Sequence, residues 1–263
     1  MSTTTVIALA ILTAGIAGLR STWSPCSLSM LSMVTPSGEA SRGHRYSLTA
    51  TWFVAGAAVG GATLGAAIAA LAAVVHQFAP EGRVVAVAVV TAAILTVGSD
   101  LRVGGLSLPR IPRQVDERWL NRYRGWVYGA GYGWQIGVGL STYVMTAAVY
   151  LMIVLGSLSG RPVVGLLIGV GFGTCRGLAL LLGARLRDPS AAHALHAWLE
   201  AAASWSLGLA VAGQVAVLGV GVGRLGAVIP AGIAAALVLA ALAASQRWAA
   251  RLTSARRRVE SAH

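Results

Sequence analysis

Residues 48–75 have the sequence LTATWFVAGAAVGGATLGAAIAALAAVV, which contains no charged side chain. A helix that crosses a bilayer needs about 20 mostly apolar residues, so this stretch is long enough to span a membrane. Similar stretches lie at about 4–36, 84–104, 127–157, 162–185, 197–221 and 226–246. The sequence therefore predicts an all-α integral membrane protein with about seven transmembrane helices.

The composition of the chain agrees with this prediction. Of the 263 residues, 56% are hydrophobic and 11% are charged, whereas a soluble domain carries about 25% charged residues. The formal net charge is +12, and the basic residues are all arginine. These arginines cluster in the loops between apolar stretches. We therefore attribute the charge to contact with anionic lipid and not to nucleic acid.

The loops carry arginine unevenly, and this predicts the orientation of the chain. Fifteen arginines follow the first, third, fifth and seventh spans, namely Arg42, Arg45, Arg102, Arg110, Arg113, Arg118, Arg122, Arg124, Arg185, Arg187, Arg247, Arg251, Arg256, Arg257 and Arg258. The opposite loops carry three, Arg83, Arg161 and Arg224. Because basic loops stay in the cytoplasm, we expect a cell-membrane protein with its N-terminus outside and its C-terminus in the cytoplasm.

The first and fourth spans share a short pattern. Residues 18–23 are GLRSTW and residues 139–143 are GLSTY, which match apart from a one-residue gap and the final aromatic residue. The second copy lies three spans after the first, an odd number, so it enters the membrane from the opposite side. We predict one polytopic membrane domain with an inverted 3+3 repeat, a pattern found in transporters. Its parts are repeat one (about 4–104), an amphipathic interfacial linker (about 105–126), repeat two (about 127–221), an additional C-terminal helix (about 226–246) and a cytoplasmic tail (247–263).

The first span contains Ser24-Pro25-Cys26-Ser27-Leu28. Proline removes a backbone donor and opens the helix, and a thiol beside a polar, water-accessible break becomes a thiolate more readily than one facing lipid. Cys26 is therefore a candidate reactive thiol. The alternative is a small buried cysteine next to an ordinary proline kink. The chain has one further cysteine, Cys175.

The Ser24-Pro25-Cys26-x-Leu28 motif, together with the inverted halves, resembles the CcdA/DsbD family of transmembrane thiol–disulfide electron carriers. In that family, one cysteine in the first helix of each repeat passes reducing equivalents from cytoplasmic thioredoxin to extracytoplasmic thiol proteins, including those of cytochrome c biogenesis. The resemblance implies that Cys26 is catalytic and that thioredoxin-like proteins are partners on either side. The second half departs from the pattern, because Ser141 and Thr142 mark its polar break without a cysteine. Cys175, in the next span, is then the candidate to pair with Cys26.

Two arginines, Arg20 and Arg176, fall within spans. A charge inside the membrane is costly and usually faces a partner or a cavity. Each arginine could lower the pKa of a neighbouring thiol or bind an anion, and Asp100 and Glu200 are possible counter-charges. Arg20 could instead reach toward the outer interface.

His193, His196 and Glu200 share one helix face and are weak candidates for a metal site. The end of an amphipathic helix would carry the same residues, and we predict neither a metal nor another cofactor.

Three functions follow as alternatives. The first is a transmembrane thiol–disulfide carrier that uses Cys26 and Cys175, an oxidoreductase-type activity. The second is a transporter or exporter of a small anion or sulfur compound, with a site formed by the helix breaks and by Arg20 and Arg176. The third is a scaffolding subunit in a membrane hetero-complex. The lipid bilayer is a partner in each case.

Overall fold

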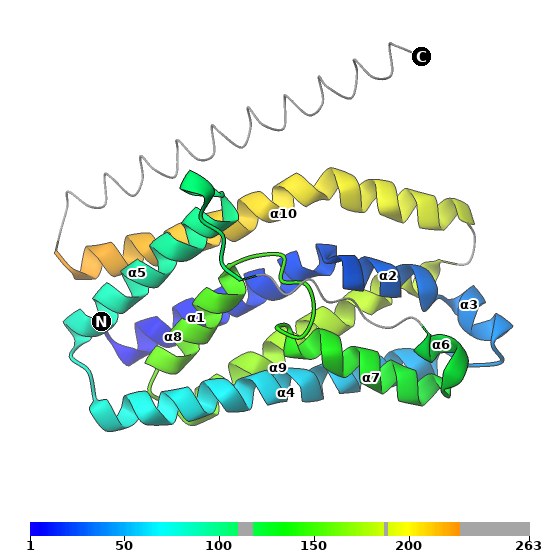
Figure 1. The fold of residues 1–263 in the computed structure, drawn as a ribbon, viewed down its shortest axis with the longest axis horizontal. Helices are drawn as coiled ribbons and strands as arrows, with labels where there is room; N and C mark the ends of the chain where they lie inside the picture. The colour runs from blue at the N-terminus through cyan, green and yellow to red at the C-terminus, as the bar shows by residue number, and fades with distance from the viewer. Residues whose placement is uncertain (110–117, 187–188, 227–263) are drawn as a thin grey trace, which may run out of the picture.

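The computed structural model describes residues 1–109, 118–186 and 189–226 as helices joined by short loops, with no strand among them (Figure 1). The α-helices are α1 (Thr3–Arg20), α2 (Pro25–Met33), α3 (Pro36–Ser41), α4 (Tyr46–Phe78), α5 (Gly82–Asp100), α6 (Trp119–Arg122), α7 (Gly125–Val138), α8 (Ala148–Leu158), α9 (Pro162–Leu178) and α10 (Pro189–Arg224). Short 3-10 helices are η1 (Ser21–Trp23), η2 (Val103–Gly105) and η3 (Ala179–Arg185). The prediction of an all-helical chain is confirmed for these residues.

Five helical stretches in the described residues are long and apolar enough to cross a membrane. They are Thr3–Trp23, Tyr46–Phe78, Gly82–Asp100, Pro162–Ala184 and His193–Arg224. They overlap the predicted spans one, two, three, five and six, although the first ends at Trp23 and not at residue 36 as predicted, because a new helix begins at Pro25. The predicted fourth span, 127–157, is two shorter helices, α7 and α8, because the chain leaves helical geometry between residues 139 and 147. The predicted seventh span, 226–246, lies outside the described residues except for Gly226.

The long helix α4 runs along one edge of the bundle and packs closely against both α7 and α9 (Figure 1). Glycine makes the approach to α9 possible. A Cβ atom added at Gly61 would lie 2.3 Å from the Gly169 carbonyl oxygen, and one added at Gly173 would lie 2.3 Å from the Ala57 carbonyl oxygen. Small residues at such contacts let backbones approach closely, which is how helices associate where lipid removes the hydrophobic driving force.

The arginine-poor loops and the N-terminus meet at one end of the bundle. The amino group of Met1 donates a hydrogen bond to the Gly82 carbonyl at 2.5 Å, and Arg224 lies 3.5 Å from the Thr5 hydroxyl. At the opposite end, the start of α7 packs against the segment before α4, where a Cβ atom at Gly125 would lie 3.3 Å from the His44 ring. The loops that carry Arg42, Arg45 and Arg124 therefore share that second end.

The predicted interfacial linker is only partly described. Its described parts contain η2 and the four-residue helix α6, whose Trp119 ring stacks on Tyr132 of α7 with centroids 5.7 Å apart. The amphipathic helix expected in this linker therefore stays a prediction. Residues 110–117 lie outside the description.

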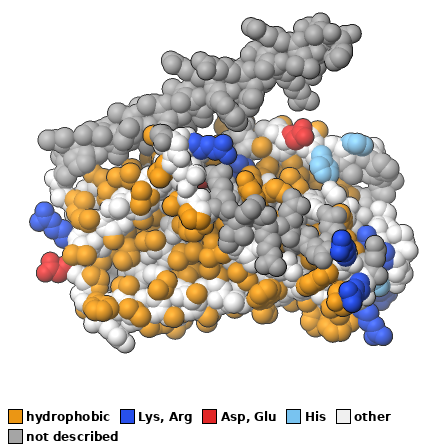
Figure 2. Space-filling view, viewed as in Figure 1, with side chains coloured by type: hydrophobic (Ala, Val, Ile, Leu, Met, Phe, Trp, Pro, Cys, Tyr) orange, Lys and Arg blue, Asp and Glu red, His pale blue; other side chains and the backbone are white. Residues whose placement is uncertain are grey.

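The outer surface of the bundle is rich in large apolar side chains, including Ile11, Val59, Leu167 and Trp205, which are 60%, 60%, 62% and 82% exposed. Figure 2 shows hydrophobic side chains over most of the visible body, with most charged groups toward its two ends. A soluble protein rarely exposes so much apolar surface. The helices and this surface together are typical of a membrane protein and are consistent with contact with lipid.

Candidate functional site at two helix breaks

The first break lies between α1 and α2. The helix narrows into η1, and Ser24 takes an extended conformation before Pro25 begins α2. The side chain of Ser24 accepts a hydrogen bond from the Ser27 amide at 3.3 Å and donates one to the Ser27 hydroxyl at 2.9 Å. Pro25 occupies the first helical position, where a missing amide proton costs nothing. The Ser-Pro pair therefore starts a new helix.

The second break, between α7 and α8, begins at Gly139, whose φ of +74° lies in the region that favours glycine. Ser141 then donates a hydrogen bond back to the Gln135 carbonyl at 2.7 Å. The start of α8 is capped from another helix, since Asp100 at the end of α5 accepts the Ala147 amide at 2.7 Å and the Thr146 hydroxyl at 2.5 Å. A carboxylate at a helix N-terminus is favoured by the helix dipole.

Asp100 also links the second break to α10. Its Oδ2 atom accepts a hydrogen bond from Gln214 Nε2 at 2.8 Å. Arg20, which is buried at 8% exposure, interacts electrostatically with Asp100 and donates to the Ser206 hydroxyl at 2.8 Å. Glu200, the other possible counter-charge, is exposed on α10. Arg20 and Asp100, both in the described part of the chain, form no ion pair within 4.0 Å, so Asp100 acts on Arg20 only as a more distant charge, while α1, α5, α8 and α10 pack together in this region.

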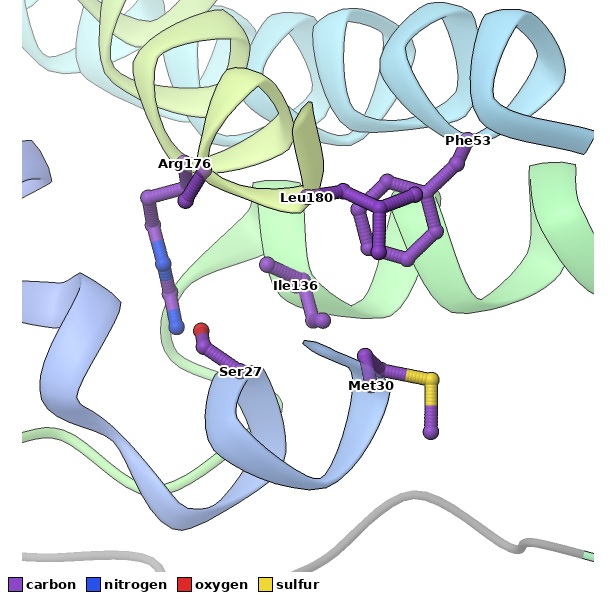
Figure 3. A pocket seen from close by; sticks show the side chains of 7 residues that line it. Ser27, Met30, Phe53, Ile136, Arg176 and Leu180 are labelled. Carbon is purple, nitrogen blue, oxygen red and sulfur yellow. The ribbon is translucent and has the colours of Figure 1, made fainter. Parts of the chain in front are cut away.

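Arg176 occupies a different environment near the end of α9. Its side chain is 2% exposed, one guanidinium nitrogen lies 3.5 Å from the Thr142 hydroxyl of the second break, and its centre is 5.6 Å from the Phe172 ring. Its Nε atom has no hydrogen-bond partner. The residue lines a cavity of about 10 Å³ together with Ser27 and apolar side chains from α2, α4, α7 and η3 (Figure 3).

The two cysteines lie near this arginine without forming a disulfide. Cys26 is buried in the first turn of α2, and Cys175 is half-buried and immediately precedes Arg176 in α9. Both thiols interact electrostatically with the Arg176 guanidinium. Cys175 also packs against α1, where a Cβ atom at Gly18 would lie 3.0 Å from its Sγ atom. The thiols therefore share one charged neighbour, and a chemical role for them stays a prediction.

The sequence reasoning missed a second polar cluster, built on Glu39 of α3. The Glu39 side chain is fully buried and accepts hydrogen bonds from Tyr128 at 2.6 Å and from Thr49 at 2.6 Å. Arg42 pairs with it at 3.0 Å, and His44 lies 3.2 Å from the Tyr128 hydroxyl. A single acidic residue in an arginine-rich loop was the available signal, but the loop was considered only for its positive charge.

The weak metal candidates do not form a cluster. His193 and Glu200 are exposed on α10, and His196 lies 3.3 Å from the Ser32 hydroxyl of α2. Within residues 1–109, 118–186 and 189–226, no three His, Cys, Asp or Glu side chains come together as metal ligands.

Similarity to known proteins decides the family. The chain is 32% identical over 200 residues to the methylamine utilization protein MauF of Methylophilus methylotrophus, a match that covers 74% of this chain and 69% of that relative. The chain belongs to the MauF family. MauF of Methylobacillus flagellatus is 31% identical over 156 residues, covering 57% of this chain and 54% of the relative. MauF of Paracoccus versutus is 29% identical over 156 residues, covering 55% and 53%. No protein-family model and no solved structure matches the chain.

Membership of the MauF family corrects the functional interpretation. The assignment to the CcdA/DsbD family is wrong, because the relatives are methylamine utilization proteins. For the same reason, the predicted thiol–disulfide carrier function, its link to cytochrome c biogenesis and the alternative of a transporter are also wrong. The physical reason is visible at Ser24 and Pro25. This pair caps and starts α2, which is a task that any interrupted membrane helix needs, so the motif is not specific to thiol chemistry. The scaffolding interpretation is replaced on the same ground, and nothing in the described residues supports a thioredoxin-like partner.

Proposed function

We propose that this chain acts in methylamine utilisation as a multi-pass protein of the cell membrane. The observation that carries the proposal is the 32% identity to a methylamine utilization protein across 74% of the chain. The match is long enough to include most of the described helices, and the apolar surface of those helices fits a membrane location. The proposal concerns the process in which the chain takes part.

The geometry favours an accessory role over chemistry on methylamine itself. The cavity between the two breaks has a volume of about 10 Å³, which is room for about one water molecule. The polar groups of the breaks largely bind one another, as Asp100 does through three hydrogen bonds. Such a core holds interrupted helices in a fixed arrangement. We therefore propose that this chain supports other components of methylamine utilisation and does not bind the amine at these breaks.

The arginine distribution supports an orientation for the chain. The N-terminus lies at the arginine-poor end of the bundle, and basic loops remain in the cytoplasm. We propose that the N-terminus faces outward, that the arginine-rich loops and the tail face the cytoplasm, and that residues 226–246 form a further span. Green fluorescent protein fused after His263 should fluoresce in cells, whereas a dark fusion that is active as periplasmic alkaline phosphatase would reverse this orientation.

We also retain the inverted repeat as a proposal. The second spans of the two halves, α4 and α9, pack against each other through glycine on both sides, as at Gly61 and Gly169. Each half also begins with an interrupted span, at residues 21–24 and at residues 139–147. These two parallels support an ancestral duplication. Whether a complete hetero-complex forms around the chain stays a prediction.

The test is genetic. Disruption of the gene in a bacterium that grows on methylamine should abolish growth on methylamine as sole carbon source and leave growth on succinate unchanged, and a plasmid copy should restore it. Purified protein in detergent should not consume methylamine. Normal growth of the disrupted strain on methylamine would refute the proposed function, and amine consumption by the purified protein would refute the accessory role.

A further inference from the structure

One long face of α10 is open in the part of the chain that the structure describes. The helix lies at the edge of the bundle, beside α5 and α1 (Figure 1). Its inner side includes Ser206 and Gln214, which bind Arg20 of α1 and Asp100 of α5. The opposite side, which we call the outer face of α10, is exposed at Trp205, Leu209, Ala212, Ala216, Gly219 and Gly223. These positions are alternately four and three residues apart, which is the spacing of a seam between two packed helices.

The part of the outer face nearest the end of α10 consists of small residues. Among the described residues, a Cβ atom added at Gly219 or Gly223 would meet nothing within 4 Å. Glycine weakens a helix relative to alanine, and between α4 and α9 packing compensates for it, as at Gly61 and Gly169. Small residues on one face let a second helix approach closely within a membrane. The outer face of α10 therefore has the spacing and the composition of a helix contact.

The sequence directly after α10 supplies a candidate for this contact. The helix ends at Arg224, and Gly226 has a φ of +69°, a left-handed conformation that commonly follows the end of a helix. The five residues 225–229 then lead to Pro230, and proline is favoured at the first position of a helix. Two helices joined by about 2–5 residues are antiparallel neighbours. The chain carries no charged residue between Arg224 and Arg247, so the proposed further span would return beside α10.

We propose that residues 226–246 pack antiparallel against the outer face of α10. Gly219 lies five residues before Arg224 and Ala235 lies five residues after Pro230, so the turn places Ala235 opposite Gly219. The contact covers the small residues of the outer face and holds α10 over the polar groups that its inner side binds. This inference rests on the proposed further span, whose crossing of the membrane the fusion at His263 tests separately. The competing occupants of the outer face are a second copy of the chain and lipid.

Disulfide cross-linking of the full chain in membranes tests the contact. Cys26 and Cys175 are replaced by serine, and Gly219→Cys is combined with Ala235→Cys. A disulfide forms only when the two Cα atoms come within about 7 Å, and copper phenanthroline with dioxygen oxidises the two thiols. Trypsin cleaves after Arg224, between the two positions, so a disulfide joins two peptides that separate on reduction. We expect mass spectrometry to find the joined peptides in most chains, and the oxidised chain to migrate as a monomer.

A matched control and the alternative occupants give distinct results. Val74 is 49% exposed on α4 and lies four residues before the end of that helix at Phe78, so Val74→Cys with Ala235→Cys should give no cross-link. A covalent dimer formed by Gly219→Cys alone would place a second copy on the outer face and overturn the proposal. Absence of any cross-link would leave the face to lipid and also overturn it. If the fusion at His263 still fluoresces in that case, the further span stands and only its contact with α10 is wrong.

A second measurement keeps both native cysteines and does not depend on how the serine variants fold. Gly219→Leu places a large side chain in the proposed contact, and we expect the midpoint of thermal unfolding in detergent to fall by about 3–10 °C, followed by circular dichroism. Gly15→Leu is the control, because Gly15 also meets nothing within 4 Å but has no second open glycine on α1. Its midpoint should stay unchanged. Equal midpoints for the two variants would overturn the proposal.

Discussion

Asp100 offers the sharpest test of the polar core, because one carboxylate serves three helices. It accepts hydrogen bonds from Thr146, from the Ala147 amide and from Gln214, and it interacts electrostatically with Arg20. Replacing it with alanine removes all of these interactions and leaves buried donors unpaired. Leaving a buried hydrogen-bonding group unpaired costs about 1–3 kcal/mol, so over three partners we expect Asp100→Ala to lose about 3–5 kcal/mol of stability.

Asp100→Asn is the more informative variant. Asparagine can still accept the Ala147 amide, and Gln214 can turn its unpartnered Oε1 atom toward the new amide group. The loss is then mainly the negative charge at the start of α8 and beside Arg20. A favourable charge at a partly buried helix terminus contributes up to about 2 kcal/mol. We therefore expect a destabilisation of about 1–2 kcal/mol, roughly half the effect of alanine.

A double-mutant cycle tests whether Arg20 is the partner. Unfolding by sodium dodecyl sulfate in mixed micelles, monitored by circular dichroism, should be measured for Asp100→Asn, for Arg20→Gln and for the double variant. Interacting residues give coupling energies of about 0.5–3 kcal/mol, and we expect the double variant to be more stable than the sum of the single effects predicts. Additive effects within about 0.3–0.5 kcal/mol would refute the view that Asp100 compensates Arg20.

Three further predictions follow from the fold. Glu39→Gln keeps the shape of the side chain but removes the charge that Arg42 and two hydroxyl groups bind. We therefore expect the free energy of unfolding to fall by about 2–4 kcal/mol in the same unfolding assay. A change below about 0.5 kcal/mol would contradict this expectation. Gly61→Val should separate α4 from α9, so that no folded, monodisperse protein is obtained in size-exclusion chromatography. Gly15→Val should give a monodisperse protein, because Gly15 has open space beside it. Equal behaviour of the two variants would contradict the glycine contact. Pro25→Ala should cost less than about 1 kcal/mol, because Ser24 still caps α2; a larger loss would show that the proline itself holds the break.

The helices and their grouping follow from strong physical constraints, and these the sequence could predict. An uncharged apolar stretch as long as residues 48–75 is typical of a membrane-spanning helix, and α4 covers that range. The loops that carry Arg83, Arg161 and Arg224 were expected on one side, and Met1 with Gly82, and Arg224 with Thr5, do meet at one end. Hydrophobicity and charge act through whole segments, so a few ambiguous residues do not alter the outcome.

The contacts between side chains could not be predicted in the same way. The sequence suggested Asp100 as a partner of an arginine. Its role in capping α8 depends on where the helical conformation is interrupted between residues 139 and 147. Glu39 was missed because its burial is a tertiary property, created by Tyr128 and Thr49 from α7 and α4. A charged residue in a loop is usually solvated, and the sequence contains no sign that this one is enclosed.

The predicted family was wrong, because the prediction rested on one local feature, the short motif at the start of α2. Ser24-Pro25-Cys26 is short, and its serine and proline have a sufficient explanation in the start of α2. A motif that satisfies a backbone requirement recurs in unrelated proteins that share the requirement. The absence of a cysteine near Ser141 and Thr142 was the stronger indication, because a carrier that works through paired thiols needs both.

Complementation tests the central claim most directly. A methylamine-utilising bacterium that lacks its own MauF should be given the gene for this chain, and growth should be measured on methylamine and on succinate. Membership of the family and the proposed role predict that this chain restores growth on methylamine, and that the Asp100→Ala variant does not. If the chain is present in the membrane at the level of the host protein and growth on methylamine is still absent, the account of its function is contradicted.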